Sequence, residues 1–248
     1  MASSTAQRLH AFLRTSVARG HTVVPVPPFT AYFDPRDSLR FLNYAIPDGD
    51  AVPTRAQIEQ LRAAFRERDR LPRLEWIEDV APRLAPELER GGMSEELRTP
   101  LMACEPHELV DARAAIDELT IRVVGDADLR DCTNLQRVAF GEEPLTAEEE
   151  PRAPGGGAVL ARAGGVPVAA AAWTKVTDGV SEIVGVATAE PWRRRGLAGA
   201  LTAAATREAF AAGASLCILS PGNETAQRVY ERAGFRRVAT MLHWSDAE

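Results

Sequence analysis

Two glycine-containing turns in the second half of the chain constrain the fold more than any other feature of the sequence. A Gly-Gly pair at 164–165 separates apolar runs at 157–162 and 166–175, and an Asp-Gly pair at 178–179 separates the second run from a third at 181–188. Such pairs between apolar runs favour the primed hairpin turns, which require positive φ angles. The sequence therefore predicts three consecutive antiparallel strands.

Helices and strands alternate after this meander. The alanine-rich stretch 197–212 has high helix propensity and is followed by a glycine, which favours a helix that ends there. A short apolar strand is expected at 216–219, and Asn223 is a suitable N-cap for a second helix. Residues 235–244 are expected to form a further strand. With a first strand at 120–124 and a helix after it, this arrangement fills about 125 residues, a typical domain size.

The first half is predicted to hold a similar alternation, although its signals are weaker. Leu9, Phe12, Leu13 and Val17 lie at helical spacing, which favours a helix over 5–19. The other elements expected, in chain order, are strands within 21–26, 29–33 and 39–46, a helix capped by Thr54 that runs to 68, a strand at 74–77, a helix at 81–90 and a strand at 93–104. Residues 105–119 are expected to be a connector with some helical character.

The ends of the two halves resemble each other at a constant offset. Positions 74 and 216, for example, differ by 142, and the residues that match at this offset are Leu74 and Leu216, Glu89 and Glu231, Arg90 and Arg232, and Gly92 and Gly234. We interpret this as a pseudo-repeat. Chance similarity between two strand–helix–strand segments is the alternative. The corresponding domains are expected at 1–118 and 119–248.

Composition excludes several classes of protein. The chain has 29 basic and 35 acidic residues, a formal net charge of -6, which disfavours nucleic acid as a partner. No stretch approaches the 18 consecutive apolar residues of a membrane span, and no signal-peptide pattern is present, so we expect a cytoplasmic protein that binds no membrane. Cys104, Cys132 and Cys217 are too few and too scattered for a disulfide framework or a zinc site. We expect no metal.

Residues 186–198 carry the strongest functional signal. An apolar strand leads into a turn that contains Arg193, Arg194, Arg195 and Gly196, and this turn opens directly into the alanine-rich helix. The start of a helix leaves backbone N–H groups unpaired and carries about half a positive charge, so it stabilises a phosphate or diphosphate. The spacings of a P-loop and of a dinucleotide-binding motif are absent. A solvated cluster of arginines is the alternative to an anion site.

The R-x-x-G-x-A spacing that begins at Arg193 resembles the acetyl-coenzyme A signature of the GNAT acetyltransferase superfamily. A second pattern downstream is similar to that family as well, and it comprises Asn223, Ala226, Tyr230, Glu231, Gly234 and Phe235. The resemblance covers residues 119–244, about half of the chain. It implies an α/β (α+β) fold with a mixed, mainly antiparallel central sheet flanked by helices, and the pseudo-repeat adds a second, degenerate GNAT-like domain in the first half.

The resemblance also implies which residues bind acetyl-CoA. Amides of residues 193–198 are expected to hold the diphosphate, and the strand at 186–188 is expected to splay at a bulge and pair with pantetheine. Asn223 and Tyr230 are expected beside the thioester. The expected cofactor-binding residues are therefore Val186, Ala187, Thr188, Arg193, Arg194, Arg195, Gly196, Leu197, Ala198, Asn223 and Tyr230.

Acyl transfer to an amine needs a neutral nucleophile, a stabilised oxyanion and a proton for the departing thiolate. Tyr230 is the candidate acid, because a phenol with a pKa of about 10 is protonated at neutral pH, while a packed core tyrosine is the alternative. Glu182 is the candidate base, acting directly or through water, while a solvent-exposed glutamate is the alternative. The amide of Val186 or Ala187 is expected to stabilise the oxyanion.

The sequence thus predicts an acetyl-CoA-dependent N-acetyltransferase that moves an acetyl group to a primary amine by direct attack. A non-catalytic acyl-CoA-binding sensor and a scaffold with a vestigial site are the alternatives. The acceptor is open among small amines, amino acids, antibiotics and protein amines, and so is the oligomeric state. The first half has Leu88 at the position of Tyr230 and Ala81 at the position of Asn223, so it is expected to lack a cofactor site and to be structural or to shape the acceptor pocket.

Overall fold

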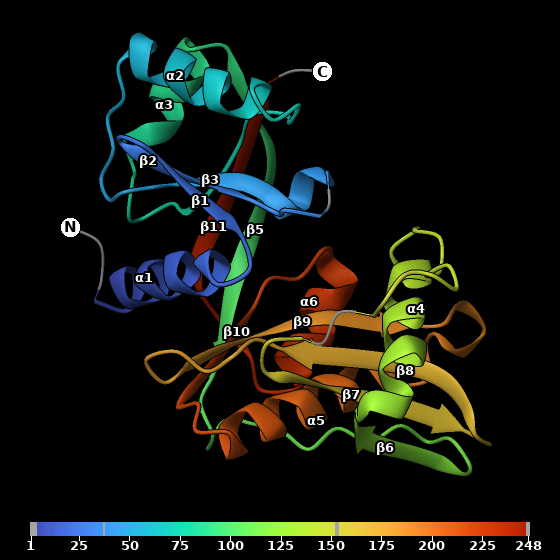
Figure 1. Ribbon diagram of the computed structural model, residues 1–248. Coiled ribbons are helices and arrows are strands. Elements are labelled where there is room, and N and C mark those ends of the chain that lie inside the picture. Colours follow the sequence, from blue (N-terminus) through green and yellow to red (C-terminus); the bar gives the residue numbers. More distant parts are fainter. Residues whose placement is uncertain (1–3, 37, 152–153, 247–248) are drawn as a thin grey trace. The chain divides into compact units, whose positions relative to one another are not determined.

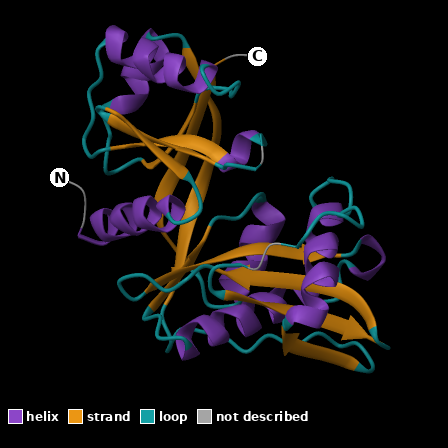
Figure 2. Ribbon diagram, viewed as in Figure 1, coloured by secondary structure: helices purple, strands orange, loops and turns teal. Residues whose placement is uncertain are grey.

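The computed structural model describes residues 4–36, 38–151 and 154–246, which form two compact units (Figure 1). Unit 1 comprises Met1–Leu101 and Arg237–Glu248, and unit 2 comprises Met102–Arg236. Each unit combines helices with strands (Figure 2). This division differs from the expected boundary at 118/119, because unit 2 begins earlier and the last strand of the chain belongs to unit 1.

Unit 2 is built around the predicted meander. Its sheet has the order β5-β10-β9-β8-β7-β6, in which β5 (Met93–Cys104) is represented by its residues from Met102 onward. The elements of this unit are β6 (Leu119–Val123), α4 (Leu129–Ala139), β7 (Gly157–Ala163), β8 (Val166–Trp173), β9 (Val180–Thr188), α5 (Leu197–Ala211), β10 (Leu216–Leu219) and α6 (Glu224–Arg232). The pairs β7–β8 and β8–β9 are antiparallel, as predicted, and β9–β10 is parallel.

Helices cover both faces of the sheet in unit 2. Side chains of a strand alternate between the two faces, and the core is divided accordingly. Ala158 and Leu160 of β7 pack with Cys132 of α4. Val159 and Ala161, the alternate residues, pack in a second cluster that contains side chains of α5 and α6. Unit 2 is therefore a three-layer arrangement with α4 on one face and α5 and α6 on the other.

Unit 1 has nearly the same order of helices and strands as unit 2. Its sheet has the order β1-β2-β3-β4-β11-β5. The elements are α1 (Ser4–Ala18), β1 (Thr22–Val26), β2 (Phe29–Phe33), β3 (Asn43–Pro47), α2 (Arg55–Arg66), β4 (Arg73–Ile77), α3 (Leu84–Arg90), β5 (Met93–Cys104) and β11 (Arg236–Asp246). The order α1-β1-β2-β3-α2-β4-α3-β5 matches α4-β7-β8-β9-α5-β10-α6-β11, and β3–β4 is parallel like β9–β10. The pseudo-repeat is thus present in the structure.

Local differences from the predicted elements have local causes. The strand predicted within 39–46 begins only at Asn43, because Arg40–Leu42 form a 3-10 turn. The Asn43 side chain explains this turn, because its amide donates to the carbonyl of Leu39 at 2.8 Å and its oxygen accepts from the N–H of Asp34 at 3.1 Å. The connector after β5 forms no helix within the described residues, contrary to the helical character expected there.

The last strand of each half pairs in an unexpected place. The strand predicted at 235–244 was expected to complete the second domain, but β11 pairs antiparallel with β4 of unit 1, from Met241 opposite Ile77 to Ser245 opposite Arg73. Likewise, β5 follows the helices of the first half, yet its last residues pair with β10 in unit 2, with Cys104 opposite Cys217. That part of the fold prediction was wrong, since the sequence patterns of strands do not specify their partners.

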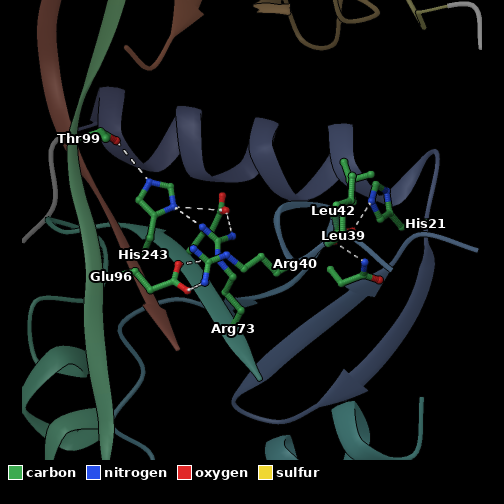
Figure 3. A network of polar contacts seen from close by, with 10 residues as sticks. His21, Leu39, Arg40, Leu42, Arg73, Glu96, Thr99 and His243 are labelled. Carbon is green, nitrogen blue, oxygen red and sulfur yellow. Dashed lines mark hydrogen bonds and ion pairs between the residues drawn. The ribbon is translucent and has the colours of Figure 1, made fainter. Parts of the chain in front are cut away.

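A buried polar network joins β11 to unit 1 (Figure 3). Arg73 on β4 is only 2% exposed and donates from Nε to Glu96 of β5 at 2.8 Å. The His243 ring of β11 lies between Arg73, at 3.2 Å, and the hydroxyl of Thr99, at 3.3 Å. Burial raises the pKa of Glu75, but its contacts with His243 and Arg73 outweigh burial and lower it below the usual value. A buried guanidinium requires such partners, and the network therefore favours the pairing of β11 with β4.

Candidate active site

Strand β9 contains a β-bulge near its middle. Val184 lies opposite Ala172 of β8 and Ala187 lies opposite Ala170, so two residues, Gly185 and Val186, face the single residue Ala171. Gly185 has a φ of +61°, the left-handed conformation that one common type of bulge requires. The expected bulge at 186–188 is therefore present one residue earlier, at 185–186.

The second half of β9 has an open edge. Strand β10 pairs with Val180, Ser181 and Glu182 of β9. In the described pairings, the residues from 183 to 188 contact β8 on one side and no strand on the other. Apart from the carbonyls of Gly185 and Thr188, which accept from the side chains of Gln136 and Arg193, main-chain groups along this edge are available to a ligand that contains amides, as in β-strand addition.

The arginine turn after β9 leads into a helix with unpaired amides. Glu190–Trp192 form a 3-10 turn, and Arg194 and Gly196 have φ angles of +67° and +84°. Gly196 is the N-cap of α5 and offers no side-chain cap. The amide of Arg193 donates to the carbonyl of Glu190 at 3.2 Å, whereas the amides of residues 194–198 have no acceptor in the part of the chain that is described. Unpaired amides at the start of a helix are able to hold an anion.

The three arginines of this turn are exposed and have no carboxylate partner among the described residues. Arg193 donates from Nε to the carbonyl of Thr188 at 3.3 Å, and the guanidinium of Arg195 lies 4.9 Å from the ring centroid of Trp192. Elsewhere in the molecule, arginines such as Arg62 and Arg98 pair with carboxylates. The uncompensated positive charge at the turn adds to the field of the helix start and favours a phosphate there.

At the equivalent helix start in unit 1, side chains already accept hydrogen bonds from backbone amides. Thr54 caps α2 by accepting from the amide of Gln57, and the Gln57 side chain accepts from the amide of Thr54 at 2.8 Å. This reciprocal capping box satisfies amides that are free in α5. The start of α2 is therefore less open to an anion than the start of α5.

Tyr230 and Asn223 lie on α6 in different environments. The Tyr230 side chain is 9% exposed, and its ring lies 6.5 Å from that of Phe235. Burial raises the pKa of the Tyr230 phenol. The side-chain oxygen of Asn223 accepts from the amide of Ala226 at 2.9 Å, so this residue acts as the predicted N-cap and only its NH₂ group is free of that role.

Glu182 and Tyr230 lie on opposite faces of the sheet, near the point where β9 and β10 stop pairing. Tyr230 belongs to the core cluster that contains Ile183, Leu197 and Leu219. Glu182 precedes Ile183, so strand alternation directs it to the face of α4, where Val184 packs with Cys132. Glu182 is half-buried, and its amide donates to the hydroxyl of Thr174 at 2.9 Å.

Gln136 on α4 is a residue of this region that sequence reasoning missed. Its side-chain amide donates to the carbonyl of Gly185 at 2.8 Å. A glycine inside a strand is a recognised sign of a bulge, and Gly185 is the signal in the sequence that could have pointed to this region. The donor from α4 could not be foreseen, because it lies 49 residues away along the chain.

Comparisons with known proteins define the class. Residues 127–235 match the model of the Acetyltransferase (GNAT) family. The solved structure of a GCN5-related N-acetyltransferase from Kribbella flavida has 33% sequence identity over 100% of this chain and 97% of that chain, with a TM-score of 0.84. The chain, both halves included, therefore has an acetyltransferase fold. It belongs to the GNAT family.

More distant structures share the fold. A GCN5-related N-acetyltransferase from Sphaerobacter thermophilus has 18% identity over 88% of this chain and 76% of that chain, with a TM-score of 0.67. A tandem GNAT protein from the clavulanic acid biosynthesis pathway has 12% identity over 88% and 77%, with a TM-score of 0.61. No curated protein matches the chain. Within the described residues, every helix is too short or too polar to span a membrane.

Proposed function

We propose that this protein is an acetyl-CoA-dependent N-acetyltransferase whose second half, 119–248, binds the cofactor. The observation that carries the proposal is the open start of α5, where unpaired amides lie beside arginines without carboxylate partners. A diphosphate would satisfy both features. The first half, 1–118, is an accessory domain that binds no cofactor, in keeping with the capping box at the start of α2.

The residues present fit acetyl-CoA along its length. Amides of residues 194–198 and the side chains of Arg193, Arg194 and Arg195 would hold the diphosphate, and Gly196 at the N-cap has no side chain that would compete for these amides. The open edge of β9 at 186–188 would bind the amides of pantetheine. When bound, the cofactor supplies a thioester, whose carbonyl carbon is the electrophile.

The catalytic roles follow from the chemistry of the side chains. Glu182 accepts a proton from the amine, directly or through water, and so yields the neutral nucleophile. The amide of Val186 or Ala187 donates to the oxyanion. Tyr230 donates a proton to the thiolate, and the raised pKa of its phenol keeps that proton in place at neutral pH. The acceptor is a primary amine of a small molecule or of a protein.

We infer a cytoplasmic location from the cysteines. Cys104, Cys132 and Cys217 are free and buried, which is typical of proteins in a reducing compartment.

One assay tests this proposal against its main alternative. Purified protein is mixed with acetyl-CoA and a panel of primary amines, and the release of free thiol is measured, while binding is followed from the thermal shift caused by coenzyme A. Release that depends on an amine supports the enzyme. A thermal shift with coenzyme A, but no release of thiol with any of the amines, would indicate a cofactor-binding sensor instead. The absence of any thermal shift would reject a cofactor site.

A further inference from the structure

The bulge in β9 leaves a carbonyl that the sheet does not satisfy. Gly185 and Val186 together face Ala171, so the regular ladder of hydrogen bonds is interrupted there. Gly185 is not exposed, and a shielded carbonyl needs a donor. The donor is the side chain of Gln136, whose Nε2 lies 2.8 Å from the carbonyl oxygen of Gly185.

The shapes of the two residues are matched. A Cβ built on Gly185 would lie only 2.3 Å from Nε2 of Gln136, so the amide fills the space that a larger residue would need. The φ of +61° at Gly185 also disfavours a side chain. Gln136 itself is half-buried on α4, with its Oε1 4.0 Å from the Cys132 sulfur. The contact is therefore a specific fit between α4 and β9.

We propose that Gln136 is a positioning residue, which holds the bulge of β9 so that the amides of Val186 and Ala187 point where the acetyl group reacts. This inference rests on the proposed function. The hydrogen bond fixes the residue immediately before these amides. Without it, the strand gains access to the regular register, and a slip of one residue reverses the direction of each group that follows.

The position of Gln136 predicts which kinetic constant changes. The diphosphate site lies at the start of α5, several residues beyond the bulge, so the KM for acetyl-CoA should rise less than kcat falls, through the pantetheine contacts at 186–188 alone. The oxyanion donor follows the bulge directly, and loss of a well-placed donor costs about 10²–10³ in kcat. A donor that is misplaced rather than deleted should lower kcat by about tenfold to a hundredfold.

Two substitutions remove the donor without changing the length of the side chain. Gln136→Met keeps the volume and abolishes hydrogen bonding. Gln136→Glu has a carboxylate that only accepts, but its protonated form regains a donor, so its rate relative to wild type should rise as the pH falls. Asn134→Leu is the matched control, because it removes another polar contact of α4, from the amide of Leu145 to Asn134 at 2.8 Å, and leaves β9 untouched.

The hydrogen-exchange rates of the amides of Val186 and Ala187 measure how firmly the bulge is held, and this measurement does not require enzymatic activity. Faster exchange and a reduced kcat in Gln136→Met, with normal values in Asn134→Leu, would support the proposal. Unchanged exchange, or a kcat equal to that of wild type, would overturn it. An equal loss of rate at every pH in Gln136→Glu would also count against it. If wild type itself releases no thiol, the proposed function fails, whereas the exchange experiment still decides whether Gln136 holds the bulge.

Discussion

A change at Gly196 gives the most direct test of the anion site at the start of α5. Its φ of +84° is best tolerated, apart from glycine, by asparagine and aspartate. The nearest atoms to a Cβ at this position are the carbonyl oxygen of Arg113 at 3.4 Å and Cα of Ala114 at 3.5 Å, which are ordinary contacts. Gly196→Asn and Gly196→Asp therefore introduce side chains of nearly equal size and conformation, and they differ by one negative charge.

The expected effect of that charge can be estimated from Coulomb's law. Two unit charges about 5 Å apart in water repel by about 0.8 kcal/mol, so a carboxylate beside a diphosphate with two charges costs about 1.7 kcal/mol. This energy corresponds to a Kd for coenzyme A that is roughly 15-fold higher in Gly196→Asp than in Gly196→Asn. The difference should shrink in about 1 M salt, where the screening length falls to about 3 Å.

Isothermal titration with coenzyme A measures both variants at low and high salt. Melting temperatures without ligand control for stability, and Gly196→Asp should be no less stable than Gly196→Asn, because the helix start and the arginines favour a negative charge. The reasoning is refuted if Gly196→Asp binds coenzyme A as tightly as Gly196→Asn at low salt. In that case the diphosphate is not held at the start of α5.

Three further predictions concern catalysis and the thiols. Tyr230→Phe should lower kcat by more than about tenfold with little change in cofactor affinity; because burial raises the phenol pKa, the wild-type rate should not fall from loss of this proton below pH 10. Glu182→Gln should lower the rate most at low pH, where the acceptor amine is protonated, and a pH profile identical to wild type would exclude this base. Burial raises the pKa of Cys104 and Cys217 to about 12, so iodoacetamide should modify these thiols near pH 8 only after unfolding; rapid labelling of the native protein would contradict their burial.

The elements of unit 2 were predictable because their signals are local. The Gly-Gly and Asp-Gly pairs specify turns through their own φ angles, and Gly164, Gly165 and Gly179 all have positive φ. Asn223 caps α6 through a contact with a residue three positions away. The strand expected at 216–219 has the same bounds in the structure.

Features that depend on distant partners were not predictable from one sequence. His243 reads as an ordinary strand residue, yet its contacts with Arg73 and Thr99 lie 170 and 144 residues away and help to place β11 in unit 1. Gln136 carries no sign of its contact with Gly185 for the same reason. Periodicity reports the face that a residue occupies, whereas the identity of its partner depends on the topology of the chain.

A local difference between the two halves of the chain supports the proposal that the second half binds the cofactor. Both place a helix after the third strand of a meander and before a parallel fourth strand. At the start of α2 the capping box satisfies the amides of Thr54 and Gln57, and an anion would have to displace those hydrogen bonds. In α5 the N-cap is a glycine without a side chain, and the arginine turn precedes it. If the free amides decide where the diphosphate binds, the start of α5 offers it a better site than the start of α2, although both units have the same arrangement of strands and helices.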